Sequence, residues 1–128
     1  MTDAISLGER ELDIMTIIWA EGSGTVEEVR EQLPDALAYT TVLSILRNLE
    51  AKGYVRHETE GRTHRYYPRV RQGTAQKSAL TRLLASLFDG SPEALITRLV
   101  DDHGVSPEEL QRLAKQLGKR GARAAEGR

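Results

Sequence analysis

The spacing of apolar residues changes abruptly at residue 53, and this change limits the folds open to the chain. In residues 39–53, "YTTVLSILRNLEAKG", apolar side chains recur every three or four positions, which is typical of an amphipathic helix. Residues 54–68, "YVRHETEGRTHRYYP", place aromatic and β-branched residues on both sides of a short polar turn, which predicts a two-stranded hairpin. Such a hairpin is only marginally stable alone, so we expect it to pack on neighbouring helices.

Two more helices precede this pair of elements. Ser6 with Glu9, and Thr25 with Glu28, fit the capping-box pattern that marks helix starts. Pro34 ends the second of these helices. The order of three helices and a hairpin predicts a winged helix-turn-helix over residues 5–72.

Residues 73–117 read as three further helices, with helix-starting signals at Ser91-Pro92 and Ser106-Pro107. Their leucines exceed what a small appendage can bury, so we expect a helical dimerisation region resembling a divided core. The candidate dimerisation residues are Leu80, Leu83, Leu84, Leu87, Phe88, Leu95, Ile96, Leu99, Leu110 and Leu113. Residues 118–128 lack periodicity and are expected to be disordered. The predicted fold class is mainly α with a small β-hairpin.

The net charge of −1 conceals a strong asymmetry along the chain. Residues 1–35 hold two basic and nine acidic groups, whereas residues 36–73 hold seven basic and three acidic groups. A positive third helix and hairpin are the electrostatic pattern of a nucleic-acid-binding surface. An ordinary solvated face is the alternative reading of the same charges.

The polar face of the third helix and the tip of the hairpin supply the candidate DNA-binding residues. Short side chains at the start of the helix allow close approach, and arginine can pair with guanine or phosphate. These candidates are Tyr39, Thr40, Thr41, Leu43, Ser44, Arg47, Arg62, His64 and Arg65. Strand parity predicts that Tyr66 points inward and Tyr67 outward. A surface helix capped by Ser and Thr, or a winged helix that binds protein, remains an alternative.

Enzyme and metal readings find little support in the sequence. The chain has no cysteine, which excludes disulfides and thiolate sites and suits a reducing cytoplasm. His57, His64 and His103 lack metal-ligand spacing, and Asp101-Asp102 before His103 fits a solvated helix end. No phosphate-binding or nucleophile motif is present. We therefore expect a non-enzymatic, cytoplasmic protein with no cofactor.

The motifs together resemble the BlaI/MecI/CopY penicillinase-repressor family over residues 5–117. The resemblance is carried by "ELDIMTIIW", "TVEEV", "TTVLSILRNLEAKG" and "EGRTHRYYP", which match the three helices and the wing. Behind them, "LFDGSPEALITRLVDDHGVSPEEL" is similar to the helical dimerisation tail of the family.

This resemblance implies a homodimeric transcriptional repressor that binds a palindromic operator in double-stranded DNA and controls a β-lactamase or cell-envelope or stress regulon. In several members a membrane sensor protease triggers cleavage within the second tail helix, at a position that aligns with Arg98-Leu99. Thr40 and Leu43 stand where known members carry basic base-reading residues, so the operator sequence does not carry over. The copper-sensing branch uses C-terminal cysteines, which this chain lacks.

Overall fold

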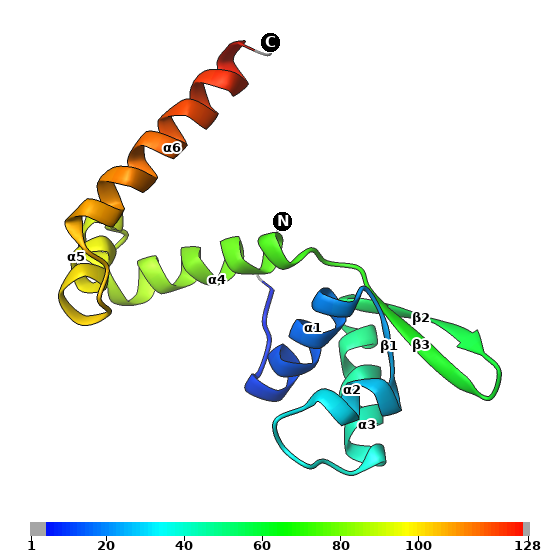
Figure 1. The fold of residues 1–128 in the computed structure, drawn as a ribbon. Helices are drawn as coiled ribbons and strands as arrows, with labels where there is room; N and C mark the ends of the chain where they lie inside the picture. Colours follow the sequence, from blue (N-terminus) through cyan, green and yellow to red (C-terminus); the bar gives the residue numbers. More distant parts are fainter. Residues whose placement is uncertain (1–4, 127–128) are drawn as a thin grey trace. The chain divides into compact units, whose positions relative to one another are not determined.

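The computed structural model describes residues 5–126, and its elements follow the predicted order (Figure 1). The first part comprises α1 (Glu9–Glu21), β1 (Gly24–Thr25), α2 (Val26–Gln32), α3 (Tyr39–Ala51), β2 (Val55–Glu60) and β3 (Thr63–Pro68). The second comprises α4 (Gln72–Leu87), α5 (Pro92–Asp102) and α6 (Pro107–Glu126). The predicted fold class, helices with a small hairpin, is confirmed.

The helix starts reveal one confirmed and one wrong capping prediction. The Thr25 hydroxyl accepts from the Glu28 amide at 3.2 Å, and the Glu28 carboxylate accepts from the Thr25 amide at 3.3 Å. Helix α1 begins later than predicted, after Gly8, whose amide donates to Glu11 at 2.8 Å. Ser6 is instead occupied by a tertiary contact, because its amide donates to the Tyr54 hydroxyl at 2.9 Å.

The sheet has three antiparallel strands in the order β1-β3-β2. In the hairpin, Val55 pairs with Pro68 and Glu60 with Thr63, so only two residues form the turn. Strand β1, which is too short to leave a sequence signal, adds Thr25 opposite Arg65 on the other edge of β3. The hairpin is thereby fastened along its second strand to the start of helix α2.

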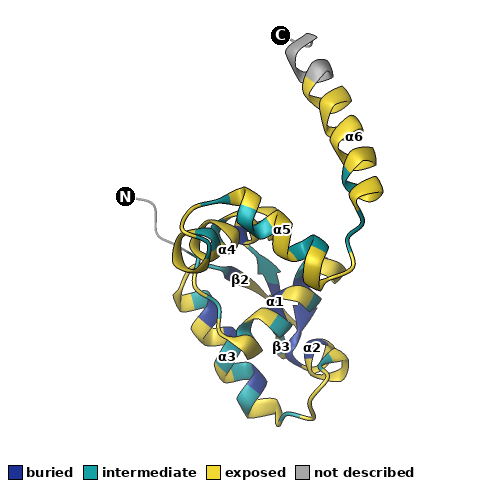
Figure 2. Ribbon diagram, turned by 90° about the vertical axis from the view of Figure 1, so that its left-hand side faces the viewer, coloured by how far each residue is buried: buried dark blue, intermediate teal, exposed yellow. Residues whose placement is uncertain are grey.

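A single hydrophobic core lies between the first three helices and the inner face of the hairpin (Figure 2). Tyr66 is 1% exposed and is the largest side chain in this core, as its strand parity predicted, while Tyr67 is only half-buried. The other core residues are Ile14, Met15, Ile18, Val26, Val29, Val42, Leu46, Leu49 and Val55. This core fixes the angle between helix α3 and the wing.

The chain divides into two units, with the boundary between Leu80 and Thr81 inside helix α4. The start of α4 belongs to the first unit, where Ala75 is buried and the Ser78 hydroxyl accepts from the Ile5 amide at 3.1 Å. The structural boundary therefore lies later than residue 72, because the winged helix also uses the first turns of α4.

The second unit is helical but buries none of the side chains described between residues 81 and 121 (Figure 2). Its helix starts match the sequence signals, since Ser91 caps α5 and Ser106 caps α6 through the amides of Ala94 and Glu109. Helix α6 continues to Glu126, where the sequence analysis expected disorder from residue 118. Alanine, lysine and arginine favour helix extension there, and this outweighs the cost of two glycines. Residues 127–128 lie outside the described chain.

Candidate nucleic-acid interface

Helix α3 presents one buried and one exposed face. Val42, Leu46 and Leu49 are fully buried, and they place Thr40, Ser44 and Arg47 on the exposed side. Thr41 is half-buried. The exposed face therefore begins with short hydroxyl side chains, and its role in DNA binding stays a prediction.

The wing ends in a tight two-residue turn at Gly61 and Arg62. Gly61 has a φ of +62°, a conformation that glycine adopts without strain and that type II′ hairpin turns require at this position. Arg62 follows at the tip and is exposed. The turn therefore projects one guanidinium group from the end of the wing.

Helix α3 and the wing enclose a cleft of about 160 Å³. It is lined by Val26, Tyr39, Leu43, Arg47, Arg62, Thr63 and His64. Five of the nine predicted DNA-binding residues thus meet at one place, although they come from two separate elements. Two guanidinium groups, an imidazole and two hydroxyls make this cleft suited to an anionic oxygen ligand such as a phosphate group.

The position of His64 in the cleft is set by a cluster on the inner face of the wing. Its ring stacks on that of His57 with centroids 4.1 Å apart and an interplanar angle of 13°. His57 Nδ1 lies 2.7 Å from a carboxylate oxygen of Glu50, which belongs to helix α3. Burial first, and then the nearby Glu50 charge, raise the pKa of Tyr66 beside this cluster. The wing is therefore tied to the C-terminal half of α3, and the sequence analysis missed this role of His57 and Glu50.

Arg65 does not join the cleft. Its guanidinium forms two hydrogen bonds with the Glu28 carboxylate at 2.8 and 2.9 Å and two with Glu60 at 3.0 Å. Hydrogen bonding to Glu28, then to Glu60, raises the pKa of Arg65, and the same Arg65 hydrogen bonds lower the pKa of both carboxyls. The structure therefore places this predicted DNA-binding residue on two acidic side chains.

Another ion pair joins the C-terminal end of helix α3 to helix α1. Glu11 accepts from Lys52 at 2.9 and 3.0 Å and from Asn48 at 2.8 Å. Desolvation raises the pKa of Glu11, but the hydrogen bonds from Gly8, Lys52 and Asn48 outweigh it, so the net shift is downward. Asn48, which lies off the apolar stripe of α3, is thus engaged within the protein.

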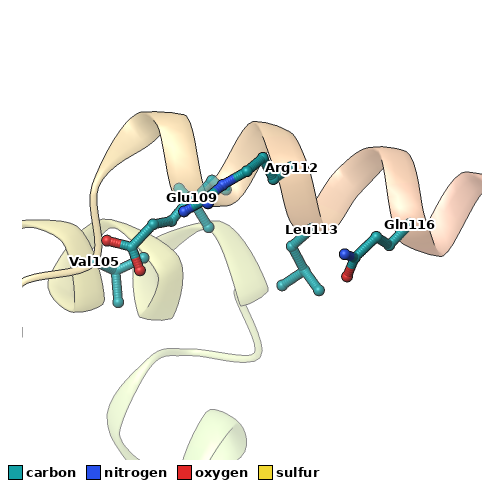
Figure 3. A pocket seen from close by; sticks show the side chains of 6 residues that line it. Val105, Glu109, Arg112, Leu113 and Gln116 are labelled. Carbon is teal, nitrogen blue, oxygen red and sulfur yellow. The ribbon is translucent and has the colours of Figure 1, made fainter.

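None of the candidate dimerisation residues is buried in the single chain. Leu87 is 74% exposed, and Leu80, Leu83, Ile96 and Leu113 are also exposed. Leu84, Phe88, Leu95, Leu99 and Leu110 are half-buried. Figure 3 shows an open pocket along α6, where Leu113 lies between Arg112 and Gln116, with Val105 and Glu109 at one end.

Comparison with known proteins decides what kind of winged helix this is. The sequence profile described as penicillinase repressor matches residues 7–119, which is most of the chain.

The chain belongs to the penicillinase repressor family.

Two curated relatives and one solved structure agree with this assignment. A penicillinase repressor of Bacillus licheniformis is 24% identical over 113 residues, covering 87% of this chain and 88% of that protein. The transcriptional regulator BlaI of Mycobacterium tuberculosis is 30% identical over 118 residues, covering 89% and 86%. The solution structure of the DNA-binding domain of the repressor BlaI shares 28% identity with a TM-score of 0.51, over 58% of this chain and 93% of that domain.

As a member of the penicillinase repressor family, the chain is a BlaI-like transcriptional repressor with a winged-helix DNA-binding fold. The predicted resemblance is confirmed, and the relatives are named as regulators of transcription rather than as enzymes. Across residues 5–126, no helix has both the length and the apolar character needed to cross a bilayer.

Proposed function

We propose that this penicillinase repressor family member is a homodimer that binds a palindromic operator in double-stranded DNA. The observation that carries the proposal is the meeting of Arg47 and Arg62 at one cleft between helix α3 and the wing. In helix-turn-helix proteins the N-terminal residues of the recognition helix reach base edges in the major groove. Thr40, Thr41 and Ser44 stand at that end of α3, and Arg47 lies one turn further along.

The wing contributes a contact with the DNA backbone in this proposal. Arg62 carries the positive charge at its tip, and His64 and Thr63 add polar groups to the same cleft. Phosphate contacts fix the register of a protein on the duplex but read no sequence. Helix α3 therefore selects the bases, while the wing holds α3 in place.

We assign the dimer contact to residues 73–117, most of which belong to the second unit. Two observations support an interface there. Several leucines are exposed, and no side chain among residues 81–121 is buried. Joining two half-site binders makes the second contact intramolecular, which raises avidity by roughly 10²–10⁴-fold. A single winged helix then does not need to bind its half-site tightly.

Relief of repression by proteolysis fits the same arrangement. The proposed cleavage position, Arg98-Leu99, lies on helix α5, where the Arg98 side chain is 67% exposed and pairs only with Asp102 at 3.2 Å among the ion pairs of the described residues. Cutting there removes Leu99, Leu110 and Leu113 from the proposed dimer contact without touching the DNA-binding surface. A membrane sensor protease is the proposed partner, and β-lactamase or cell-envelope and stress genes are the proposed targets.

Selection of bound duplexes from a random-sequence DNA library by the full-length protein tests this function. We expect an inverted repeat with half-sites centred one or two helical turns apart, which matches a two-fold symmetric dimer. Recovery of unselected sequence would support the alternative, a winged helix that binds protein.

A further inference from the structure

Arg65 lies in strand β3 between His64, which is exposed, and Tyr66, which is buried. The rings of His64 and Tyr66 contact each other on one face of the hairpin, so Arg65 points to the opposite face. Its side chain is 21% exposed, much less than the 47% of Glu28 and the 55% of Glu60. The guanidinium is therefore partly covered, and the two acids that meet it lie nearer the solvent.

All five N–H donors of Arg65 are used within the protein. Nε donates to Glu60 at 3.0 Å, Nη1 to Glu28 at 2.8 Å and to the Ser23 hydroxyl at 3.2 Å. Nη2 donates to Glu28 at 2.9 Å and to Glu60 at 3.0 Å. Five is the complete donor set of an arginine, so a phosphate group can be bound only by displacing Glu28, Glu60 or Ser23.

The two carboxylates belong to different elements. Glu60 is the last residue of β2 and adjoins the wing turn, whereas Glu28 lies in the first turn of α2. Glu28 also completes the capping box of α2 with Thr25, which pairs with Arg65 in the sheet. One guanidinium therefore joins the base of the wing turn to the start of α2.

We infer that Arg65 is a positioning residue that holds the wing against helix α2 and makes no contact with DNA itself. This inference rests on the proposed function, because it assigns how the wing tip is presented to the duplex. Two bidentate pairs define a plane and a direction, which an ion pair with a single contact does not. The position of Arg62 at the cleft follows from this arrangement.

The positioning role of Arg65 predicts a change in DNA affinity opposite to the change that net charge alone predicts. Glu60 is a negative charge on the DNA-binding wing, so its neutralisation should strengthen binding to DNA if only net charge matters. If Glu60 instead helps to hold Arg65 and the wing, Glu60→Gln weakens binding. Residues within one hydrogen-bond network show coupling that corresponds to roughly 2- to 100-fold in affinity.

The experiment measures two quantities on the full-length protein and its Arg65→Lys, Glu60→Gln and Arg62→Ala variants. The first is the backbone mobility of Gly61 and Arg62, from ¹⁵N heteronuclear relaxation without DNA. The second is affinity for a duplex of random sequence over a range of salt concentrations. Thermal unfolding of each variant verifies that it is folded at the temperature of measurement.

We expect Arg65→Lys to raise mobility at the wing tip, because lysine is a point charge that cannot bridge both carboxylates in one plane. Glu60→Gln should raise mobility too and should weaken DNA binding. Arg62→Ala should leave mobility at Gly61 unchanged while lowering the salt slope by about one phosphate contact.

An unchanged wing tip in both Arg65→Lys and Glu60→Gln overturns the inference. So does tighter DNA binding by Glu60→Gln, since this would show that the net charge of the wing decides affinity and that Glu60 does not hold the wing in its binding position. Absence of DNA binding by every form would refute the proposed function instead, while the mobility data would still decide the role of Arg65.

Discussion

Arg47 on helix α3 and Arg62 on the wing line the same cleft, and Leu43 and Tyr39 form its wall on the helix side. The cleft brings a base-reading candidate and a backbone-contact candidate side by side. Their roles therefore differ in kind, and substitutions should separate them.

Arg62→Ala is expected to weaken binding to all DNA sequences alike and to reduce the slope of log affinity against log salt by about one unit. The reason is that a phosphate contact releases counterions but reads no base. Titration of a selected operator and of a scrambled duplex at several salt concentrations measures both effects.

Arg47→Ala and Thr41→Ala should instead change which bases are preferred, at a cost of about 1–3 kcal/mol for each lost base contact. Repeating the library selection with each variant measures the change in preference. Equal, sequence-independent losses for Arg47, Thr41 and Arg62 would show that α3 does not read the bases.

Leu87→Asp with Leu113→Asp should abolish dimerisation while leaving the winged helix folded. Both leucines are exposed in the single chain, so a charge there disrupts a subunit contact rather than the core. Leu12→Asp is the matched control, because Leu12 on α1 is 46% exposed and Leu113 is 48% exposed. Sedimentation equilibrium should detect a monomer only for the variant with Leu87→Asp and Leu113→Asp. A dimer in both proteins would show that these leucines are not part of the subunit interface.

Gly24→Ala should destabilise the winged helix by about 1–3 kcal/mol. A Cβ at this position would lie 2.9 Å from Val29 Cγ2, and Val29 is fully buried and branched, so it has little room to move. Gly73→Ala serves as the control, since its Cβ would meet no atom within 4 Å, and its effect should stay within about 0.5 kcal/mol. Urea unfolding measures both, and equal midpoints would contradict the packing described for β1.

Acid should weaken the attachment of the wing to α2. The Arg65 hydrogen bonds, and secondarily the Thr25 amide, hold the pKa of Glu28 below its ordinary value of 4.5 despite some desolvation. The folded protein thus binds fewer protons than the unfolded chain, so this contribution is complete above about pH 4.5 and is lost as pH falls towards the lower folded pKa. Glu28→Gln keeps a capping acceptor but removes the titration. Its free energy of unfolding should fall less steeply with acid than that of the wild type, and parallel curves would contradict this.

The sequence predicted the elements whose signals are local. The apolar period of α3, the Gly61-Arg62 turn and the capping box at Thr25 each depend on residues close together in the chain, and each is present in the structure. Tyr66 was also placed correctly, because alternation along a strand is a local rule.

The sequence could not predict features that depend on distant partners. In the sequence, Arg65 and Arg62 look equivalent, because both are arginines of the basic hairpin. Only the positions of Glu28 and Glu60 in the fold reveal that Arg65 is engaged. Ser6 matched a capping motif but is held by Tyr54, far away in the chain. Charge counting located the basic helix and hairpin but could not tell that Arg65 is engaged by two carboxylates.

In the proposed complex with DNA, two winged helices read one palindrome together. Titrating the full-length protein with the selected inverted repeat, with a single half-site and with random duplex at about physiological salt tests this most directly. We predict that the repeat binds at least about 10³-fold more tightly than random DNA, in the range of specific DNA-binding proteins, and well above the half-site. Equal affinity for all three duplexes would contradict the account.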